Sequence, residues 1–190
     1  MARDDILWWI DCIRLWNRRS VFLDEQWLTS VDFHLFTDAS GSGVGGVFGT
    51  LWFADALLPC ERVLSIAWRE LFAVVMSCYI WGSHFVGRRL LFHCDNISVV
   101  SIVNSGTSKC QLVMILVRAL YHIAVSYNFD VKLVHVPGVD NTEADLLSRG
   151  YVDRFVQLFG ESYQDKPTPT SRGFLSPMFA CTLEERYRRP

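Results

Sequence analysis

The spacing of apolar and polar positions predicts strands and helices that alternate along most of the chain. Short apolar runs bounded by turn residues predict five strands, at residues 34–38, 44–53, 61–64, 90–94 and 130–136. Helical spacing predicts one helix from Ser65 to near Gly82, two at residues 96–103 and 109–127, and a last one capped by Asp140. This order, β-β-β-α-β-α-α-β-α, predicts an α/β fold in which helices cover both faces of a five-stranded mixed sheet.

The regions before and after residues 33–150 have different patterns. Four of the seven Trp lie in residues 1–32, and Ile6, Trp9, Ile13 and Trp16 recur at helical spacing. A helix with this much aromatic surface needs a partner, so we interpret residues 1–32 as the helical end of a preceding domain. Residues 151–190 are expected to form a helix over 151–159, followed by a linker rich in Pro, Ser and Thr.

Composition indicates a globular, reduced protein. Hydrophobic residues make up 51% of the chain and charged residues only 20%, which is not the composition of a disordered protein. The 6 Cys form no Cys-x-x-Cys pair and have no His at zinc-ligand spacing, so we expect neither a disulfide framework nor a zinc site. We see no signal peptide and no membrane-spanning run, which needs ~20 apolar residues. We therefore expect an intracellular protein, in the cytoplasm or nucleus.

The charge balance gives little support for strong nucleic-acid binding. The formal net charge is −2, and the 18 basic residues are 15 Arg and 3 Lys. Arg suits phosphate recognition, but codon bias and surface solubility explain the same excess equally well. Residues 33–150 hold eight basic and nine acidic residues, so we expect this domain to bind a nucleic-acid duplex weakly on its own.

Two carboxylates lie at positions that could be functional: Asp38 at the end of the first predicted strand, and Glu70 on the inward face of the long helix. Asp38 precedes a Gly-rich turn, and Asp side chains are common there because they bond nearby backbone. Glu70 has only apolar residues three and four positions away on its helix, so it lies on the face that should be buried. A buried carboxylate needs a metal ion or a charged partner. Arg62 and Arg69 are the structural alternatives to a metal.

Two further carboxylates follow later in the chain. Asp95 ends the apolar run 90–94, and ligands bind at the carboxyl ends of central strands in α/β sheets. Its local explanation is a cap for the next helix. Asp145 lies four residues before Arg149, and a surface ion pair between them is its local explanation.

Together, the four carboxylates predict a metal site. Adjacent strands would carry Asp38 and Asp95, and helices on the sheet would bring in Glu70 and Asp145. Four carboxylates at one point repel each other unless cations neutralise them. Two divalent ions ~4 Å apart form a clamp for in-line attack on phosphodiesters. Because the ligands are hard oxygens without a Cys or His cluster, we expect two Mg²⁺ ions, with Mn²⁺ as the alternative.

At these residues the chain resembles type 1 ribonuclease H, in the form found in retrotransposon reverse transcriptases. The resemblance covers residues 33–150, with four motifs in order. Within that form, the chain resembles the DIRS group of retroelements. The motifs are Phe36-Thr37-Asp38-Ala39-Ser40 with Gly43, Gly45 and Gly46; Glu70 within Ser65-Ile66-Ala67-Trp68-Arg69-Glu70-Leu71; His93-Cys94-Asp95-Asn96; and His135-Val136-Pro137-Gly138, Asn141 and Ala144-Asp145-Leu146-Leu147-Ser148-Arg149.

The resemblance implies a ribonuclease H-like fold and a metal-dependent endonuclease that hydrolyses the RNA strand of RNA–DNA hybrids. It implies Asp38, Glu70, Asp95 and Asp145 as metal ligands, and an upstream reverse transcriptase domain as partner. One metal would activate the water and the other would stabilise the leaving 3′ oxygen. Family members also use a His near the last motif, for which His135 is the candidate here. Its spacing is short, and a plain sheet histidine explains it as well.

We also expect six residues to contact the hybrid. They are Ser40, Asn96, Asn104, Ser105, Lys109 and Asn141. The stretch after the second predicted helix lacks the basic insertion of cellular family members, but its polar side chains can bond phosphate and the 2′-OH. Ordinary turn chemistry explains that stretch equally well.

Two other functions remain open at this point. A transposase or integrase of the same fold would typically use three carboxylates with a late Glu, which the Asn141 and Asp145 pattern does not match. A catalytically silent or domesticated module could keep all four acids and only bind nucleic acid. We expect neither a membrane nor a small-molecule cofactor as partner.

Overall fold

The computed structural model describes residues 27–94, 96–135 and 141–175, with the short pieces 6–7, 9–10 and 13–14. The strands of this part are β1 Trp27–Thr29, β2 Leu35–Ala39, β3 Gly43–Phe48, β4 Leu51–Ala56, β5 Arg89–Cys94 and β6 Asp130–His135. The helices are α2 Ser30–Phe33, α3 Pro59–Arg62, α4 Ile66–Trp81, α5 Ile97–Ser105, α6 Gln111–Tyr127, α7 Thr142–Ser148 and α8 Val152–Phe159, with 3-10 turns η1 Gly82–His84 and η3 Gly160–Ser162. None of the described helices is both long and apolar enough to cross a membrane.

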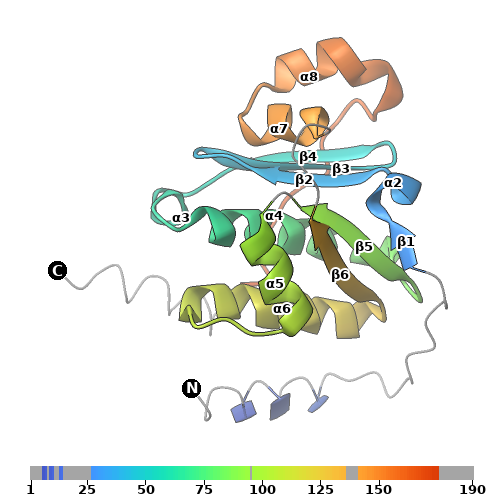
Figure 1. Cartoon of the computed structure of the whole chain (residues 1–190). Helices are drawn as coiled ribbons and strands as arrows, with labels where there is room; N and C mark the ends of the chain where they lie inside the picture. The colour runs from blue at the N-terminus through green and yellow to red at the C-terminus, as the bar shows by residue number, and fades with distance from the viewer. Residues whose placement is uncertain are drawn as a thin grey trace.

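The described strands form two three-stranded sheets with different pairings. β2, β3 and β4 pair antiparallel in chain order. β5 lies between β1 and β6 and pairs parallel with both. β2 also contacts β5, so the two sheets lie next to each other (Figure 1). The α/β class and the mixture of parallel and antiparallel pairs are as predicted, but the ladders are three plus three rather than one five-stranded sheet.

Two of the predicted strands were wrong in detail. Residues 44–53, predicted as one strand, form the hairpin of β3 and β4, which turns at Gly49 with a positive φ of 56°. Residues 61–64 were predicted as a strand, but Glu61 and Arg62 belong to α3. Pro59 in the first turn favours a helix start. The Glu61 carboxylate accepts a hydrogen bond from the Leu58 backbone N–H at 2.7 Å, which satisfies a donor at that start.

A strand also forms where sequence pattern predicted only helix. Trp27–Thr29 make β1, with Trp27 opposite Arg89 of β5. The Arg89 guanidinium and the Lys132 ammonium lie 5.7 Å and 4.8 Å from the centre of the Trp27 ring. Such cation–π contacts help to hold a strand of only three residues on the sheet. Most of residues 1–26, on which the predicted N-terminal helix falls, lie outside the described residues.

Helices cover both faces of the β2-β3-β4 sheet, as predicted (Figure 1). On one face α4 packs against β2 and β3 and is backed by α6; on the other, α7 packs against all three strands, with α8 beyond it. Because α4 lies between a sheet and a helix, it is apolar on most of its surface. It begins where predicted, since the Ser65 hydroxyl accepts a hydrogen bond from the Trp68 N–H at 3.2 Å.

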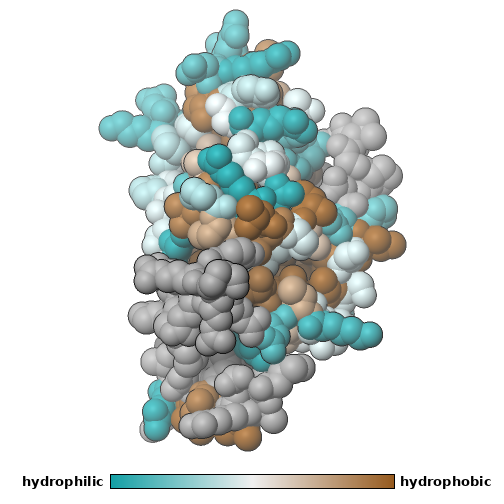
Figure 2. All heavy atoms as spheres, turned by 90° about the vertical axis from the view of Figure 1, so that its left-hand side faces the viewer, coloured by the Kyte–Doolittle hydropathy of each residue, from teal (hydrophilic) through white to brown (hydrophobic). Residues whose placement is uncertain are grey.

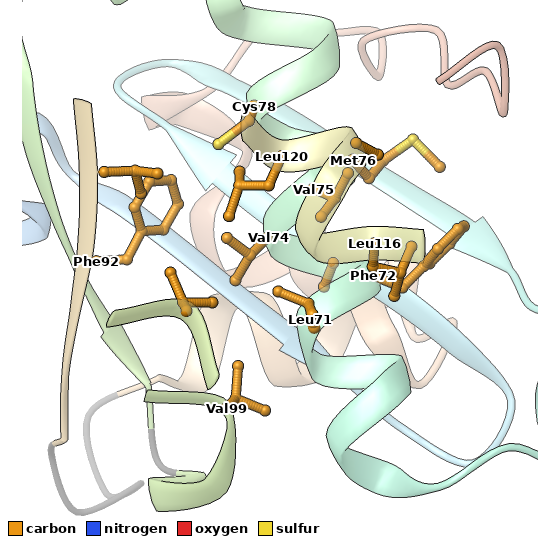
Figure 3. Close-up of a cluster of buried hydrophobic side chains, with 14 of the residues drawn as sticks. Leu71, Phe72, Val74, Val75, Met76, Cys78, Phe92, Val99, Leu116 and Leu120 are labelled. Atoms are coloured by element: carbon orange, nitrogen blue, oxygen red, sulfur yellow. The ribbon is translucent and has the colours of Figure 1, made fainter. Parts of the chain in front are cut away.

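The core fills the space between α4, α5, α6 and β5. Figure 3 shows the α4 side chains of Leu71 and Val74 close to Leu116 and Leu120 of α6, with Phe92 of β5 beside them. All of these residues are buried. A second, smaller cluster lies between the outer face of the β2-β3-β4 sheet and α7 and α8. The sheet is therefore held from both sides, which fixes the ends of its strands relative to α4 and α7.

Residues 163–175, predicted as part of a linker, contain no helix or strand but lie along the domain. The backbone N–H groups of Gln164 and Thr168 donate to the carbonyls of Thr50 and Trp52, at 2.9 Å and 2.7 Å. The two acceptors lie just before and at the start of β4, the outer strand of its sheet. An uncovered outer strand is a template for unwanted pairing, so this segment also protects the edge.

Arg172 fastens the same segment to the domain. Its guanidinium pairs with Glu61 at 2.8 Å and with Asp55 at 2.9 Å, and it lies 5.6 Å from the centre of the Phe72 ring. Glu61 is only 2% exposed. A buried carboxylate is costly without a partner, so Arg172 neutralises a charge that the domain could not otherwise hold there.

Candidate active site

One cavity of about 740 Å³ gathers three of the four predicted acidic residues. Its described lining residues come from the end of β2, the first turns of α4 and α5, and α7. They are Asp38, Ala39, Ile66, Glu70, Asn96, Ile97, Asn141, Thr142, Asp145 and Arg149. Segments more than 100 residues apart in the chain thus place carboxylates on one concave surface.

Asp38 is held in place from the α7 side. The Ser148 hydroxyl donates a hydrogen bond to Asp38 Oδ2 at 2.5 Å, and Ser148 is buried. The approach of α7 depends on glycines in β3, because a Cβ on Gly45 would lie 2.5 Å from the Cβ of Leu147. A Cβ on Gly43 would lie 2.7 Å from the Ser148 carbonyl oxygen. Because these glycines have no side chains, α7, which carries Asp145, can pack closely against β2 and β3.

Glu70 is buried, as its helix position predicts. Its side chain is 7% exposed, yet the residue lines the cavity. Both arginines considered as its structural partners bond to backbone. Arg69 Nη1 donates to the Ser40 carbonyl at 2.8 Å, and Arg62 Nε donates to the Leu57 carbonyl at 2.9 Å. The Arg69 bond ties α4 to the turn after β2, which keeps Glu70 near Asp38.

Asp145 takes part in the ion pair that its spacing predicts as the local explanation. Arg149 Nε lies 2.7 Å from Asp145 Oδ1, and the two side chains are 55% and 42% exposed. The hydrogen bond and charge of Asp145 raise the pKa of Arg149, and Asp38 adds to this shift. Arg149 is therefore a cation within the electrostatic reach of two of the carboxylates.

The remaining predicted catalytic residues are Asp95 and His135. Asp95 lies outside the described residues, directly after Cys94 at the end of β5. His135 is the last residue of β6, is exposed, and is paired with Cys94 in the parallel ladder. It is not one of the described residues that line the cavity. The predicted cap Asp140 also lies outside the described residues, and α7 has Asn141 at its N-cap position.

Three of the six predicted hybrid contacts lie at or beside the cavity. Asn141 Nδ2 donates to the Thr37 carbonyl at 2.9 Å, whereas its buried Oδ1 meets no hydrogen-bond donor within the described ranges. The Asn96 side chain accepts from two N–H groups at the start of α5, so it is a helix cap. Ser40 donates to the Ser148 carbonyl at 2.7 Å and thus holds the turn after β2 against α7.

The other three predicted contacts lie around the end of α5 and the start of α6, apart from the cavity lining. Both halves of the Asn104 amide bond to the backbone of Leu133, at 2.7 Å and 2.9 Å. Asn104 therefore joins α5 to β6. Ser105 and Lys109 are exposed.

Replacing Asn104 with Ala is expected to lower the free energy of unfolding by about 1–3 kcal/mol, because it leaves the N–H and C=O of Leu133 without partners. Urea unfolding measures this effect. The matched change Ser105→Ala, one residue on, should be nearly neutral because its hydroxyl is exposed. An Asn104→Ala protein with unchanged stability but weakened hybrid binding would restore the sequence-based interpretation.

The donor set of the cavity fits a divalent cation. Carboxylate oxygens are the ligands that Mg²⁺ and Mn²⁺ prefer. Within residues 27–94, 96–135 and 141–175, however, no group of three or more His, Cys, Asp or Glu is arranged so that it could hold a metal ion. The fourth predicted ligand, Asp95, falls between these ranges.

Several lining residues were not singled out from the sequence. Ile66 and Ile97 are the first helical residues of α4 and α5, and both are exposed at the cavity. Each follows a residue whose side chain caps the helix, Ser65 or Asn96, so an apolar residue after a cap was the available clue. Ser148, the hydrogen-bond donor to Asp38, lies three residues after Asp145 on α7. Only the tertiary structure reveals its role, because Asp38 is 110 positions away.

Figure 2 shows the side of the molecule that is at the left in Figure 1. Among its coloured atoms, hydrophobic side chains gather near the middle, and hydrophilic ones are more frequent toward the top, where α8 lies. Neither kind covers the whole face.

No protein-family model matches the chain, and no curated protein sequence matches it. Among solved structures, the crystal structure of RNase H1 from the halophilic archaeon Halobacterium salinarum NRC-1 is similar, with a TM-score of 0.49. The match has 15% sequence identity and covers 68% of this chain and 99% of the archaeal protein. At this TM-score and identity, the match does not identify the activity of this chain.

Proposed function

We propose that the chain is a ribonuclease H-like, metal-dependent endonuclease that hydrolyses the RNA strand of RNA–DNA hybrids. The observation that carries the proposal is the single cavity lined by Asp38, Glu70 and Asp145. These residues come from β2, α4 and α7, and each belongs to a different one of the sequence motifs. Three carboxylates on one concave surface repel each other, so their arrangement supports the binding of a cation between them.

In this proposal, Asp38, Glu70 and Asp145, together with Asp95, hold two Mg²⁺ ions. When bound, the ions would activate the attacking water and stabilise the leaving 3′ oxygen. The chain's own contribution is positioning. Ser148 orients the Asp38 carboxylate, and burial in α4 limits the motion of Glu70.

We also propose a role for His135 and a place for the chain in a larger protein. His135 is the last residue of β6 and is paired with Cys94, the last residue of β5, so it lies at the carboxyl end of this parallel pair; Asp95 follows Cys94 in the sequence. From there His135 would assist proton transfer.

The motif form supports membership of a retroelement reverse transcriptase, with a polymerase domain in front of the chain.

A second candidate is a catalytically silent nucleic-acid-binding module of the same fold. The Asp145–Arg149 ion pair favours this candidate, because Arg149 binds a carboxylate that catalysis would require as a metal ligand. The two candidates differ in turnover rather than in binding.

A substrate panel tests the proposed function. The purified chain is incubated with Mg²⁺ and equal amounts of RNA–DNA hybrid, double-stranded RNA and double-stranded DNA of one sequence. We expect cleavage of the hybrid with little sequence preference, because shape and the 2′-OH rather than base edges are recognised. Equal cutting of double-stranded DNA contradicts the assignment, and binding of the hybrid without any cleavage supports the silent module.

A further inference from the structure

Arg149 lies between two adjoining cavities. It lines the acidic cavity and also a second one of about 300 Å³, which borders β3, β4 and the end of α7. Arg62 lines the second cavity but not the first. Arg149 therefore borders both an acidic cavity and a cavity that contains a second arginine.

In the first environment Arg149 holds a proposed metal ligand. Its Nε is 2.7 Å from Asp145 Oδ1, and both side chains are substantially exposed. Exposed ion pairs of this kind are weak, so a divalent cation can displace the guanidinium from the carboxylate. A divalent ion on Asp145 would weaken this ion pair, because the ion and the guanidinium repel each other and compete for the charge of one carboxylate.

The second environment suits an anion. Its described acidic lining residue, Asp55, shares the guanidinium of Arg172 with Glu61, at 2.9 Å and 2.8 Å. The same lining carries Arg62 and Arg149, so its basic residues outnumber its acidic one, and the charge of Arg149 becomes available there once it leaves Asp145. Arg side chains present forked donors that match a phosphate group, and the cavity lies next to the carboxylates where the strand would be cut.

We propose that Arg149 exchanges partners when the metal binds. Without metal it neutralises Asp145; with metal it turns to the second cavity, where it and Arg62 bind a backbone phosphate of the hybrid next to the cleaved one. The inference rests on the proposed function, because it takes Asp145 as a metal ligand. Arg149 then acts as a binding residue that also sets the metal affinity.

The first test measures Mg²⁺ binding by calorimetry without nucleic acid. Arg149→Gln should tighten Mg²⁺ binding roughly three- to tenfold, because a competing and repelling cation is removed. Arg149→Lys should stay near wild type, since it keeps the charge. Arg62→Gln should have no effect. The matched control is Arg154→Gln, which removes the same charge from an exposed position on α8.

The second test measures hybrid cleavage at saturating Mg²⁺. Arg149→Gln and Arg62→Gln should each raise KM roughly three- to tenfold with kcat within about twofold, because a phosphate contact made equally in ground and transition states affects binding alone. The slope of log affinity against log salt concentration should fall by about one for each variant. Arg149→Lys should also raise KM, because Lys lacks the forked donors.

The outcomes separate this inference from the proposed function. If wild type cleaves the hybrid but Arg149→Gln binds Mg²⁺ with the same affinity as wild type, the partner exchange is wrong and the proposed function is retained. An Arg62→Gln KM equal to that of Arg154→Gln overturns the phosphate site. A wild-type protein that binds Mg²⁺ but never cleaves hybrid contradicts the proposed function, while the calorimetry still decides whether Arg149 competes with the metal.

Discussion

Asp38→Asn is expected to reduce hydrolysis of an RNA–DNA hybrid by at least about 100-fold, because a neutral amide is a much poorer ligand for a divalent ion than a carboxylate. The fold should be retained. The amide has nearly the same size as the carboxylate, and its oxygen still accepts the hydrogen bond from the buried Ser148 hydroxyl. Activity with Mg²⁺ and thermal melting in EDTA measure the two effects.

The melting temperature of Asp38→Asn in EDTA should be equal to or above that of wild type, because one of the carboxylates around the cavity loses its charge. The matched control is Asp165→Asn, which makes the same chemical change at an exposed position outside the helices and strands and should alter neither property. An Asp38→Asn protein that cleaves at nearly the wild-type rate would remove Asp38 from the site. A much lower melting temperature would show that Asp38 is structural.

A chain that ends at Gly150 is expected to lose most of its folding stability, although all four acidic motifs are present in it. The truncation removes Phe155 and Tyr163, whose rings pack with each other, and Phe155 also packs on Trp52 of β4. Losing a buried aromatic side chain costs about 3–5 kcal/mol, and a whole domain has only about 5–15 kcal/mol of stability. Thermal or urea unfolding of the purified proteins measures the loss.

The control for this truncation is a chain that ends at Leu175, which keeps every described contact of the C-terminal segment. A single substitution gives a finer test. Arg172→Met should cost about 3 kcal/mol, because the Glu61 carboxylate stays buried without its cation. The double variant with Glu61→Gln should recover part of that loss. If the chain ending at Gly150 unfolds at the same urea concentration as the chain ending at Leu175, the C-terminal segment is only a linker.

Elements with strong local patterns were predicted well. Ser65 caps α4 as predicted, because its side chain bonds to an N–H group three residues away. Asn96, predicted as the first residue of its helix, instead caps α5 in the same way. The hairpin of β3 and β4 was missed because apolar residues stand on both sides of the turn at Gly49 and Thr50, and Gly also occurs within the strand before it. The strand β1 has three residues, too few for a periodicity to be read.

The residues of the site divide in the same way, into those set by local sequence pattern and those set by distant partners. The burial of Glu70 follows from its apolar neighbours on α4 and was confirmed. Both the cavity position of Asp145 and its pairing with Arg149 occur, so the functional and the local interpretation of that residue are not exclusive. The interaction of Asn104 with Leu133 was not predictable from local pattern, because its partner is on another element 29 residues away. The bond of Arg172 to Glu61 spans 111 residues and was missed for the same reason.

The measurement that tests the central claim most directly is strand-resolved cleavage of a hybrid labelled separately in its RNA and its DNA. The purified chain is incubated with Mg²⁺ or with EDTA, and the ends of the products are identified. The account predicts RNA fragments with 5′-phosphates in Mg²⁺, an intact DNA strand, and no cleavage in EDTA. Cleavage that persists in EDTA, cleavage of both strands, or no cleavage with either Mg²⁺ or Mn²⁺ would contradict it.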